Sequence, residues 1–236
     1  MYMRVEPHGI GSVLHVIKRG ARGMDIVRNK SDRQRFELLL FYMNDSFSDQ
    51  NWSENLKFCR PFERPDHWPE REPLVRILAW TLLDNHFHLL LEEIREGGTA
   101  KFMQRLCGSM SAAFNAKYSE RGSLFQGSYK SRTIKGDPYL RYLSFYIQVK
   151  NVFDMYPGGV VKAVNNFEKA WEWALQYQYS SLQAYITNTE SPIIEKELLT
   201  DLYLDQKSFK KEAREMLALH TQHHDEKYST LLLEPW

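Results

Sequence analysis

Residues 80–92 read Trp80-Thr81-Leu82-Leu83-Asp84-Asn85-His86-Phe87-His88-Leu89-Leu90-Leu91-Glu92. Two runs of strand-forming residues flank Asp84-Asn85, a pair typical of a tight turn, so the stretch predicts a β-hairpin. Alternate residues of a strand point to the same face, which places His86 and His88 together, with Cα atoms roughly 7 Å apart. Phe87 would then point into a core. A strand with two imidazoles on one face is a candidate metal platform.

The remaining patterns predict strands and helices in alternation. Predicted strands cover 13–18, 74–83 and 86–94, predicted helices cover about 31–43, 99–119 and 137–153, and 124–134 is irregular or extended. Residues 44–73 contain four prolines and many charges, which indicates a long surface insertion. This order predicts an α+β fold in which helices pack on an antiparallel sheet.

Pro157-Gly158-Gly159 predicts the end of a first domain, 1–157, followed by a mainly helical C-terminal region, 158–236, with 198–219 as its clearest helix. The two parts differ in charge. The C-terminal region has 8 Lys/Arg and 12 Asp/Glu, a net of −4, which leaves 23 basic and 18 acidic residues, a net of +5, in 1–157. The C-terminal region is therefore an acidic appendage to a basic domain.

Composition narrows the class of protein. The 236 residues are 43% hydrophobic and 14% aromatic, which is typical of a packed globular protein. We find no apolar run that approaches the roughly 20 residues of a membrane helix, and no signal peptide. Cys59 and Cys107 are far apart and form no CxxC pair, so we expect reduced thiols and a cytoplasmic protein.

A basic segment, 101–135, interleaves positive charges with aromatic residues. This combination suits a polyanion with bases that can stack, whereas the alternative is a solvated helix face followed by a basic loop. The candidate DNA contacts are Arg105, Lys117, Arg121, Phe125, Lys130 and Arg132.

The helix that begins at Asp137-Pro138 carries three tyrosines, Tyr139, Tyr142 and Tyr146. They lie along one side of the helix. They could be residues at the rim of the core, or one of them could be a nucleophile facing a metal bound by histidine. The spacing does not choose among them.

Three blocks of the chain resemble successive motifs of the HUH single-tyrosine transposases, and in particular the REP-associated tyrosine transposases. They are Leu14-His15-Val16-Ile17-Lys18-Arg19-Gly20, Leu78 to Leu91, and Gly122-Ser123-Leu124-Phe125-Gln126-Gly127-Ser128-Tyr129-Lys130-Ser131. The resemblance extends over about 13–153. It implies a ferredoxin-like antiparallel sheet whose central strand carries the metal-binding histidines, here His86 and His88.

The resemblance also implies a function. The nucleophile in this family stands in a block similar to Tyr146-Ile147-Gln148-Val149-Lys150-Asn151, which assigns it to Tyr146. Attack on a phosphate held by Mg²⁺ or Mn²⁺ would leave a 5′-phosphotyrosine and a free 3′-hydroxyl. The expected partner is single-stranded DNA with hairpins or inverted repeats, bound by a monomer or a homodimer.

The chain departs from the family one turn after the tyrosine, where Lys150 replaces a carboxamide that helps to hold the ion. Asn151 could take this role only if an extra residue bulges out of the helix. Otherwise Lys150 contacts the phosphate directly, or cleavage is weak. The alternatives are therefore a catalytically impaired DNA-binding protein derived from such a transposase, and an unrelated HxH metallohydrolase acting on a small molecule.

For four further histidines we expect a structural role and not metal binding. His15 is expected to pack near the sheet, while His220, His223 and His224 are expected on a solvated C-terminal helix.

Overall fold

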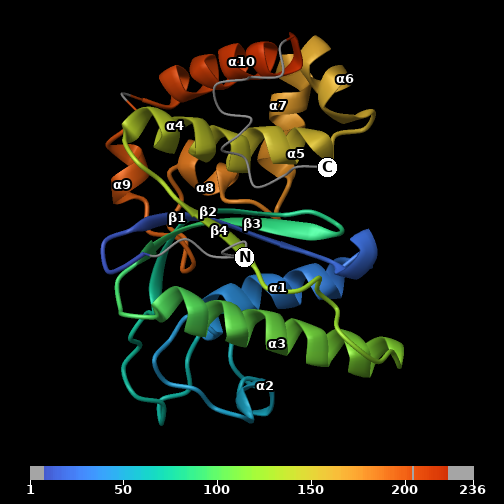
Figure 1. The fold of residues 1–236 in the computed structure, drawn as a ribbon, viewed down its shortest axis with the longest axis vertical. Coiled ribbons are helices and arrows are strands. Elements are labelled where there is room, and N and C mark those ends of the chain that lie inside the picture. Colours follow the sequence, from blue (N-terminus) through green and yellow to red (C-terminus); the bar gives the residue numbers. More distant parts are fainter. Residues whose placement is uncertain (1–7, 204, 223–236) are drawn as a thin grey trace, which may run out of the picture.

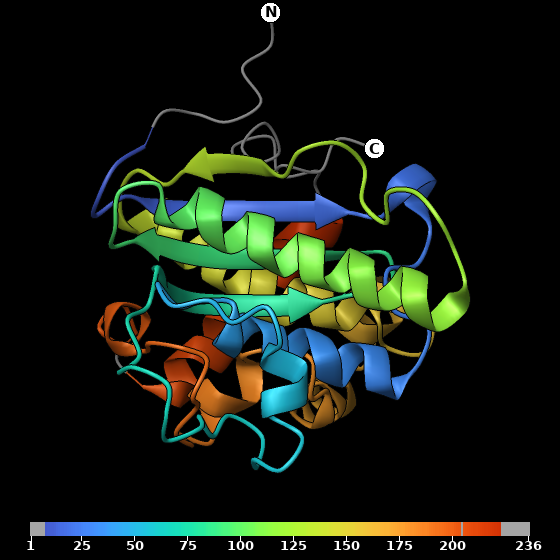
Figure 2. The ribbon, with the colours of Figure 1, turned by 90° about the horizontal axis from the view of Figure 1, so that it is seen from below.

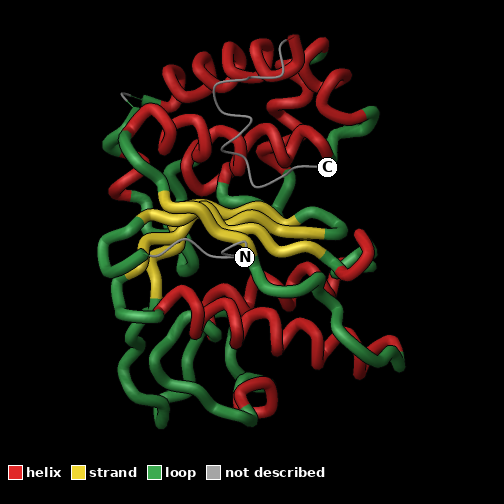
Figure 3. The backbone as a smooth tube through the Cα atoms, viewed as in Figure 1, coloured by secondary structure: helices red, strands yellow, loops and turns green. Residues whose placement is uncertain are grey.

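The computed structural model describes residues 8–203 and 205–222. Four strands form one sheet, and helices lie on both of its faces (Figures 1 and 3). The strands are β1 (Val13–Arg19), β2 (Val75–Leu82), β3 (His86–Glu93) and β4 (Lys130–Thr133). The helices are α1 (Lys30–Tyr42), α2 (Trp52–Asn55), α3 (Gly98–Tyr118), α4 (Asp137–Phe145), a π-helix (Tyr146–Lys150), α5 (Asn151–Asp154), α6 (Gly159–Asn165), α7 (Phe167–Gln176), α8 (Leu182–Ile186), α9 (Glu197–Thr200) and α10 (Gln206–Gln222), with a 3₁₀ turn at Ala21–Gly23.

The sheet is antiparallel throughout, with the strand order β2-β3-β1-β4 (Figure 2). Helix α1 connects β1 to β2 and helix α3 connects β3 to β4. This order and these two helical connections are those of a ferredoxin-like sheet, so the predicted α+β fold is confirmed. β1 and β3 are the central strands, and the predicted turn between β2 and β3 lies at Asp84-Asn85.

Helices α1 and α3 cover one face of the sheet (Figure 1). Phe87, Leu89 and Leu91 of β3 are fully buried there, in one cluster with Phe36 of α1 and Phe102 of α3. The apolar half of the alternating β3 pattern therefore faces this core, and the two histidines face the opposite side.

Helix α4, the π-helix and α5 cover the second face (Figure 1). Leu78, Ala79 and Leu90 from the sheet pack there against Tyr146 and Ile147. This side of the sheet is therefore also buried, and the histidines lie between two layers.

A further apolar cluster joins the tyrosine-bearing helix to the C-terminal helices. Its buried members are Phe145, Val149, Val152, Phe153, Ala163, Phe167, Ala170, Trp171, Ala174, Leu182, Phe209, Ala213 and Leu217. The domain boundary at 157/158 stays a prediction, and this shared core crosses it.

The C-terminal region also covers the free edge of β2. The N–H of Leu82 donates to Tyr179 O (2.9 Å), and the N–H of Ser181 donates to Trp80 O (3.0 Å). An exposed strand edge invites pairing with other chains, so these bonds protect the sheet.

The insertion at 44–73 lies below α1 and α3 in Figure 3 and contains only the short helix α2. Aromatic contacts anchor it, including Tyr42 with Trp52 (ring centroids 5.8 Å apart) and with Trp68 (6.3 Å). These contacts attach the segment that was predicted as a surface insertion, and its status as an insertion stays a prediction.

The predicted helix over 198–219 is interrupted. Helix α9 ends at Thr200, and α10 begins at Gln206. The carboxylate of Asp205 accepts a hydrogen bond from the N–H of Ser208 (2.7 Å) and so caps α10. Within the described residues, no helix combines the length and the apolar character that a membrane crossing requires.

Candidate functional site

His86 and His88 lie side by side on β3, and their ring centroids are 5.1 Å apart. Both are buried, on the face opposite to Phe87. His86 Nδ1 is 2.6 Å from Asn85 Oδ1. The period of the strand therefore produces the predicted pair, and the turn residue Asn85 orients its first member.

His15 on β1 belongs to the same site. His15 Nε2 and His88 Nδ1 share a hydrogen bond of 2.9 Å, and the two rings are stacked with centroids 5.2 Å apart. A histidine that binds a metal through one ring nitrogen is usually held by a hydrogen bond at the other. Since Nδ1 of both His86 and His88 is engaged in this way, Nε2 is the nitrogen that each could offer to an ion.

Tyr146 begins the π-helix and faces these histidines. Its ring centroid is 5.8 Å from that of His88 and 6.5 Å from that of His15. The side chain is only 1% exposed, and Tyr142 stacks on it at 6.2 Å. The geometry thus brings the predicted nucleophile and the predicted metal ligands together.

A π-turn separates Tyr146 from Asn151. The N–H of Asn151 donates to Tyr146 O, five residues earlier, instead of to a carbonyl four residues earlier. Such a turn contains one residue more than an α-turn, so the fifth residue takes roughly the place that the fourth has in an α-helix. The bulge that Asn151 requires in order to face the site is therefore present.

The side chain of Asn151 is buried, 1% exposed, and neither Oδ1 nor Nδ2 has a hydrogen-bond partner among the described residues. A buried amide without a partner calls for an explanation, because each such group is destabilising by about 1–3 kcal/mol. An oxygen ligand beside two imidazole nitrogens fits Mg²⁺ or Mn²⁺. Among the described residues, no three His, Cys, Asp or Glu side chains gather so that they could hold an ion, so an ion on His86 and His88 would need a ligand of another type.

Lys150 also points toward Tyr146. Lys150 Nζ is 3.5 Å from Tyr146 Oη and 2.8 Å from Asp154 Oδ2. The ammonium also lies over the Tyr146 ring, 4.9 Å from its centroid. Lys150 and Asn151 therefore lie in different surroundings: Lys150 contacts the phenol and Asp154, whereas the Asn151 amide is buried without a partner among the described residues.

His220 of α10 was expected on a solvated helix, and the structure corrects this. Its ring centroid is 6.1 Å from that of Tyr146, because α10 folds back over α4 (Figure 1). Neither this contact nor the one made by His15 has a local sequence signal, since both depend on tertiary packing. His223 and His224 lie outside the described residues.

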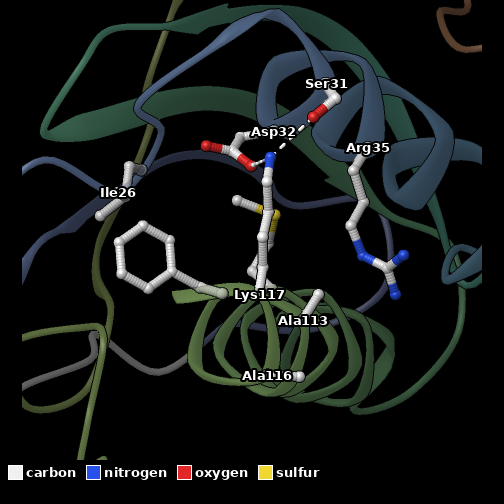
Figure 4. Close-up of a pocket in the computed structure, with 9 residues that line it drawn as sticks. Ile26, Ser31, Asp32, Arg35, Ala113, Ala116 and Lys117 are labelled. Carbon is white, nitrogen blue, oxygen red and sulfur yellow. Dashed lines mark hydrogen bonds and ion pairs between the residues drawn. The ribbon is translucent and has the colours of Figure 1, made fainter. Parts of the chain in front are cut away.

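Two predicted DNA contacts, Arg105 and Lys117, lie on α3 and are engaged within the protein. Arg105 donates to the backbone oxygens of Asp45, Ser46 and Phe47 and so holds the insertion. Lys117 extends from α3 toward α1 (Figure 4) and donates to Asp32 Oδ1 at 2.6 Å. Both are on the face of the sheet opposite to Tyr146.

The basic residues of β4 lie nearer to the histidines. Arg132 pairs with His15, and Lys130 pairs with Ile17, which in turn pairs with His88 on β3. Directly paired residues on neighbouring strands point to the same face. Lys130 and Arg132 therefore share the face of Tyr146.

The two remaining candidate DNA contacts, Arg121 and Phe125, differ in the solvent exposure of their side chains. Arg121 is exposed after the end of α3. Phe125 is 3% exposed and packs against Phe87, with ring centroids 6.0 Å apart, beneath Lys18. The Phe125 ring is packed in the core, so neither of its faces is accessible for stacking with a base.

The chain was compared with known proteins. Residues 70–150, which contain β2, β3, α3 and Tyr146, match the family model described as "Transposase IS200 like". Over these residues the chain is similar to the IS200-like transposases, and this similarity supports the resemblance that the sequence motifs indicate.

Two further comparisons complete this result. No curated protein matches the chain. A solved structure, that of a REP-associated tyrosine transposase bound to a REP hairpin, is similar over 83% of this chain and 90% of that chain, with 12% sequence identity and a TM-score of 0.47.

Proposed function

We propose that this protein is an IS200-like transposase that nicks and rejoins single-stranded DNA through a 5′-phosphotyrosine intermediate on Tyr146. The observation that carries the proposal is the contact of the Tyr146 ring with His88 and His15 across two layers of the fold. The substrate is proposed to be single-stranded, because a scissile phosphate must reach a buried tyrosine and flanking bases can stack on aromatic side chains. Hairpins or inverted repeats in that DNA are proposed from the resemblance to the REP-associated tyrosine transposases.

The ion is proposed to be Mg²⁺ or Mn²⁺, held by His86, His88 and Asn151. When bound, it would offset the charge of the scissile phosphate and of the departing 3′ oxygen. His15 and Asn85 act as positioning residues, since each fixes Nδ1 of one ligand histidine.

Tyr146 supplies the nucleophile. Its Oη forms a bond to phosphorus as the bond from phosphorus to the 3′ oxygen breaks, and overall the phenol proton passes to that oxygen. The intermediate retains a phosphodiester, so a 3′-hydroxyl can attack it, release Tyr146 and join new ends. The ammonium of Lys150 donates a hydrogen bond of 3.5 Å to Tyr146 Oη, so a positive charge lies beside the attacking oxygen.

Lys130 and Arg132 are proposed to contact the DNA backbone beside the site, since β4 presents them on the face of Tyr146. Arg121 remains a candidate contact near the end of α3. Arg105, Lys117 and Phe125 are not part of this proposal, because their side chains are occupied in the fold.

One observation favours a second function, that of a DNA-binding protein with impaired cleavage. Tyr146 is 1% exposed, so the phenol is covered in this conformation, and Lys150 is bonded to Asp154. DNA cleavage then requires access to Tyr146, whereas binding along β4 does not.

A cleavage assay tests the first function against the second. A labelled single-stranded DNA hairpin is incubated with the protein and Mn²⁺, and covalent adducts are resolved on a denaturing gel. We expect an adduct with the native chain and with Tyr142→Phe, and none with Tyr146→Phe. Specific binding without an adduct in the native chain would favour the second function.

A further inference from the structure

A cavity of about 520 Å³ lies between the π-helix and the C-terminal helices α8, α9 and α10. The residues that matter for its chemistry are Gln148 and Leu199 at its floor, Tyr185, Tyr203 and Phe209 in its walls, and Lys207 at its rim. Gln148 is two residues from Tyr146, and such residues lie on roughly opposite sides of a helical turn. The cavity is therefore separate from the histidine site but shares a structural element with it.

At the floor of the cavity, the side-chain oxygen of Gln148 is a buried hydrogen-bond acceptor without a donor among the described residues. Gln148 is 1% exposed, and its Oε1 accepts no hydrogen bond from any residue in the described parts of the chain. Since native proteins seldom leave a buried carboxamide oxygen unpaired, an N–H group of a ligand is the natural partner.

The walls contain aromatic rings, and the two tyrosines are fixed in position by hydrogen bonds. The Tyr203 hydroxyl donates to Arg141 O (3.2 Å) and lies 2.6 Å from Ser144 Oγ, while the Tyr185 hydroxyl donates to Leu78 O (2.7 Å). Burial raises the pKa of Tyr203 to about 12, so its hydroxyl stays neutral. Because both hydroxyls are used inside the protein, the tyrosines offer the cavity their rings.

The rim adds one exposed positive charge. Lys196 also lines the cavity, but its ammonium is bound to Ala184 O (3.0 Å) and Thr189 O (2.5 Å). Asp205 caps α10. Lys207 is exposed at the rim, where it could contact a phosphate.

We propose that this cavity binds a single nucleobase with an exocyclic amino group, preferably adenine. Aromatic walls suit a planar ring, a carboxamide is the side chain that pairs with the N6 amino group of adenine, and a rim lysine suits the attached phosphate. The inference deepens the proposed function, on which it rests, by placing one unpaired base of the DNA behind the tyrosine-bearing helix.

Fluorescence anisotropy with the full chain tests this proposal. The probes are a short labelled oligodeoxyadenylate and the same strand with deoxynebularine, a purine that lacks the amino group. We expect the native chain to bind the adenine strand about 10-fold more tightly, the effect of one buried hydrogen bond. Gln148→Met should remove this preference, and the matched variant Gln183→Met, at an exposed position outside the cavity, should keep it.

A second variant keeps the test valid if Gln148→Met does not fold. Thr200→Trp, at an exposed position on the rim, should block the cavity and lower the affinity for the adenine strand by about 10-fold. Equal binding of the two strands by the native chain, or an unchanged preference in Gln148→Met and Thr200→Trp, would overturn the proposal.

Titration with a free nucleotide and the adduct assay distinguish the base site from a nucleotide site and from the proposed function. Titration with free dAMP identifies the source of the base: tighter binding of the strand than of dAMP assigns the cavity to DNA, and the reverse order assigns it to a free nucleotide. Adduct formation on Tyr146 without any adenine preference would refute the base site and leave the proposed function intact. A preference for adenine that depends on Gln148, without any adduct on Tyr146, would support the base site and refute the proposed function.

Discussion

Two buried asparagines show how a residue's partners distinguish a structural role from a ligand role. Asn44 is 2% exposed and satisfies its amide completely, accepting from the N–H groups of Leu74 and Val75 (both 3.0 Å) and donating to Val75 O (2.9 Å). Asn151 is equally buried, and its amide has no partner among the described residues. The first amide connects the insertion to β2, whereas the second is consistent with an ion that it would help to hold.

This contrast predicts opposite effects of two alanine variants. Asn44→Ala should lower the free energy of unfolding by about 1–3 kcal/mol, because it leaves backbone groups unpaired, and should not change Mn²⁺ affinity. Asn151→Ala should leave stability nearly unchanged and weaken Mn²⁺ binding by about 10-fold or more. Chemical denaturation and Mn²⁺ titration measure the two quantities. Unchanged Mn²⁺ affinity in Asn151→Ala would remove this residue from the site.

Glu37 on α1 provides a prediction about pH. Burial raises the pKa of Glu37 from 4.5 to about 7, so the folded state holds the proton more tightly than the unfolded state. The resulting destabilisation is absent below pH 4.5, grows between pH 4.5 and 7, and is constant above this range.

Glu37→Gln should therefore stabilise the protein at pH 8 by about 1–3 kcal/mol, after allowance for partial solvent screening, and have little effect near pH 4. Denaturation curves across this range measure the difference. Glu70→Gln, at an exposed position, is the control and should show no such trend. A constant effect of Glu37→Gln at all pH values would contradict the prediction.

At the scale of elements, the site depends on three segments that are distant in the chain. Strand β1 supplies His15, β3 supplies His86 and His88, and the helix after Asp137 supplies Tyr146. The alternating pattern of β3 was sufficient to predict the histidine pair, and the Asp-Pro signal predicted the start of α4. The π-turn has no comparable local signature. Val149, Val152 and Phe153, which lie on and after it, are buried in the core shared with the C-terminal helices.

The other differences between prediction and structure also arise from tertiary packing. His15 could not be placed from sequence, since its contact with His88 requires the register of β1 against β3. The same holds for His220 on α10. The prediction that Lys117 contacts DNA came from a basic segment interleaved with aromatic residues, and in the fold α1 presents Asp32 to this lysine. Charge patterns identify basic segments, and the fold determines which of their side chains are already paired.

Ser181, which lies against the edge of β2, is predicted to stabilise the fold through its hydroxyl group. Ser181 Oγ accepts a hydrogen bond from the N–H of Trp80 (3.1 Å) in a buried position. Ser181→Ala should leave that N–H unpaired and lower the free energy of unfolding by about 1–3 kcal/mol. Ser48→Ala, at an exposed position in the insertion, should change it by less than about 0.5 kcal/mol. Equal stability of the two variants in chemical denaturation would show that the contact adds nothing.

At the scale of the whole molecule, the C-terminal helices and the tyrosine-bearing helix have one core. Phe145 and Val149, which flank Tyr146, are in the same apolar cluster as Trp171 and Phe209. We therefore expect the helical layer that carries Tyr146 (α4, the π-helix and α5) to unfold together with the C-terminal region. The acidic C-terminal region is then a support for the helix that carries Tyr146, in addition to covering the edge of β2.

Trp171→Ala tests this cooperativity. The buried indole should contribute about 3–5 kcal/mol, and the variant should still unfold in one transition, shifted to lower denaturant concentration. Trp173→Ala, at a half-buried position on the same helix, should have a smaller effect of about 1 kcal/mol. Two separate transitions in Trp171→Ala, with the sheet unaffected by the first, would indicate independent units.

The proposed function depends on a covalent bond between Tyr146 and DNA. The native protein is incubated with single-stranded hairpin DNA and Mn²⁺, digested with nuclease and protease, and analysed by mass spectrometry for a nucleotide attached to a tyrosine. We predict that the modified peptide contains Tyr146 as the linked residue. A nucleotide on Tyr139 or Tyr142, or no modified peptide under conditions where the DNA is bound, would contradict the account.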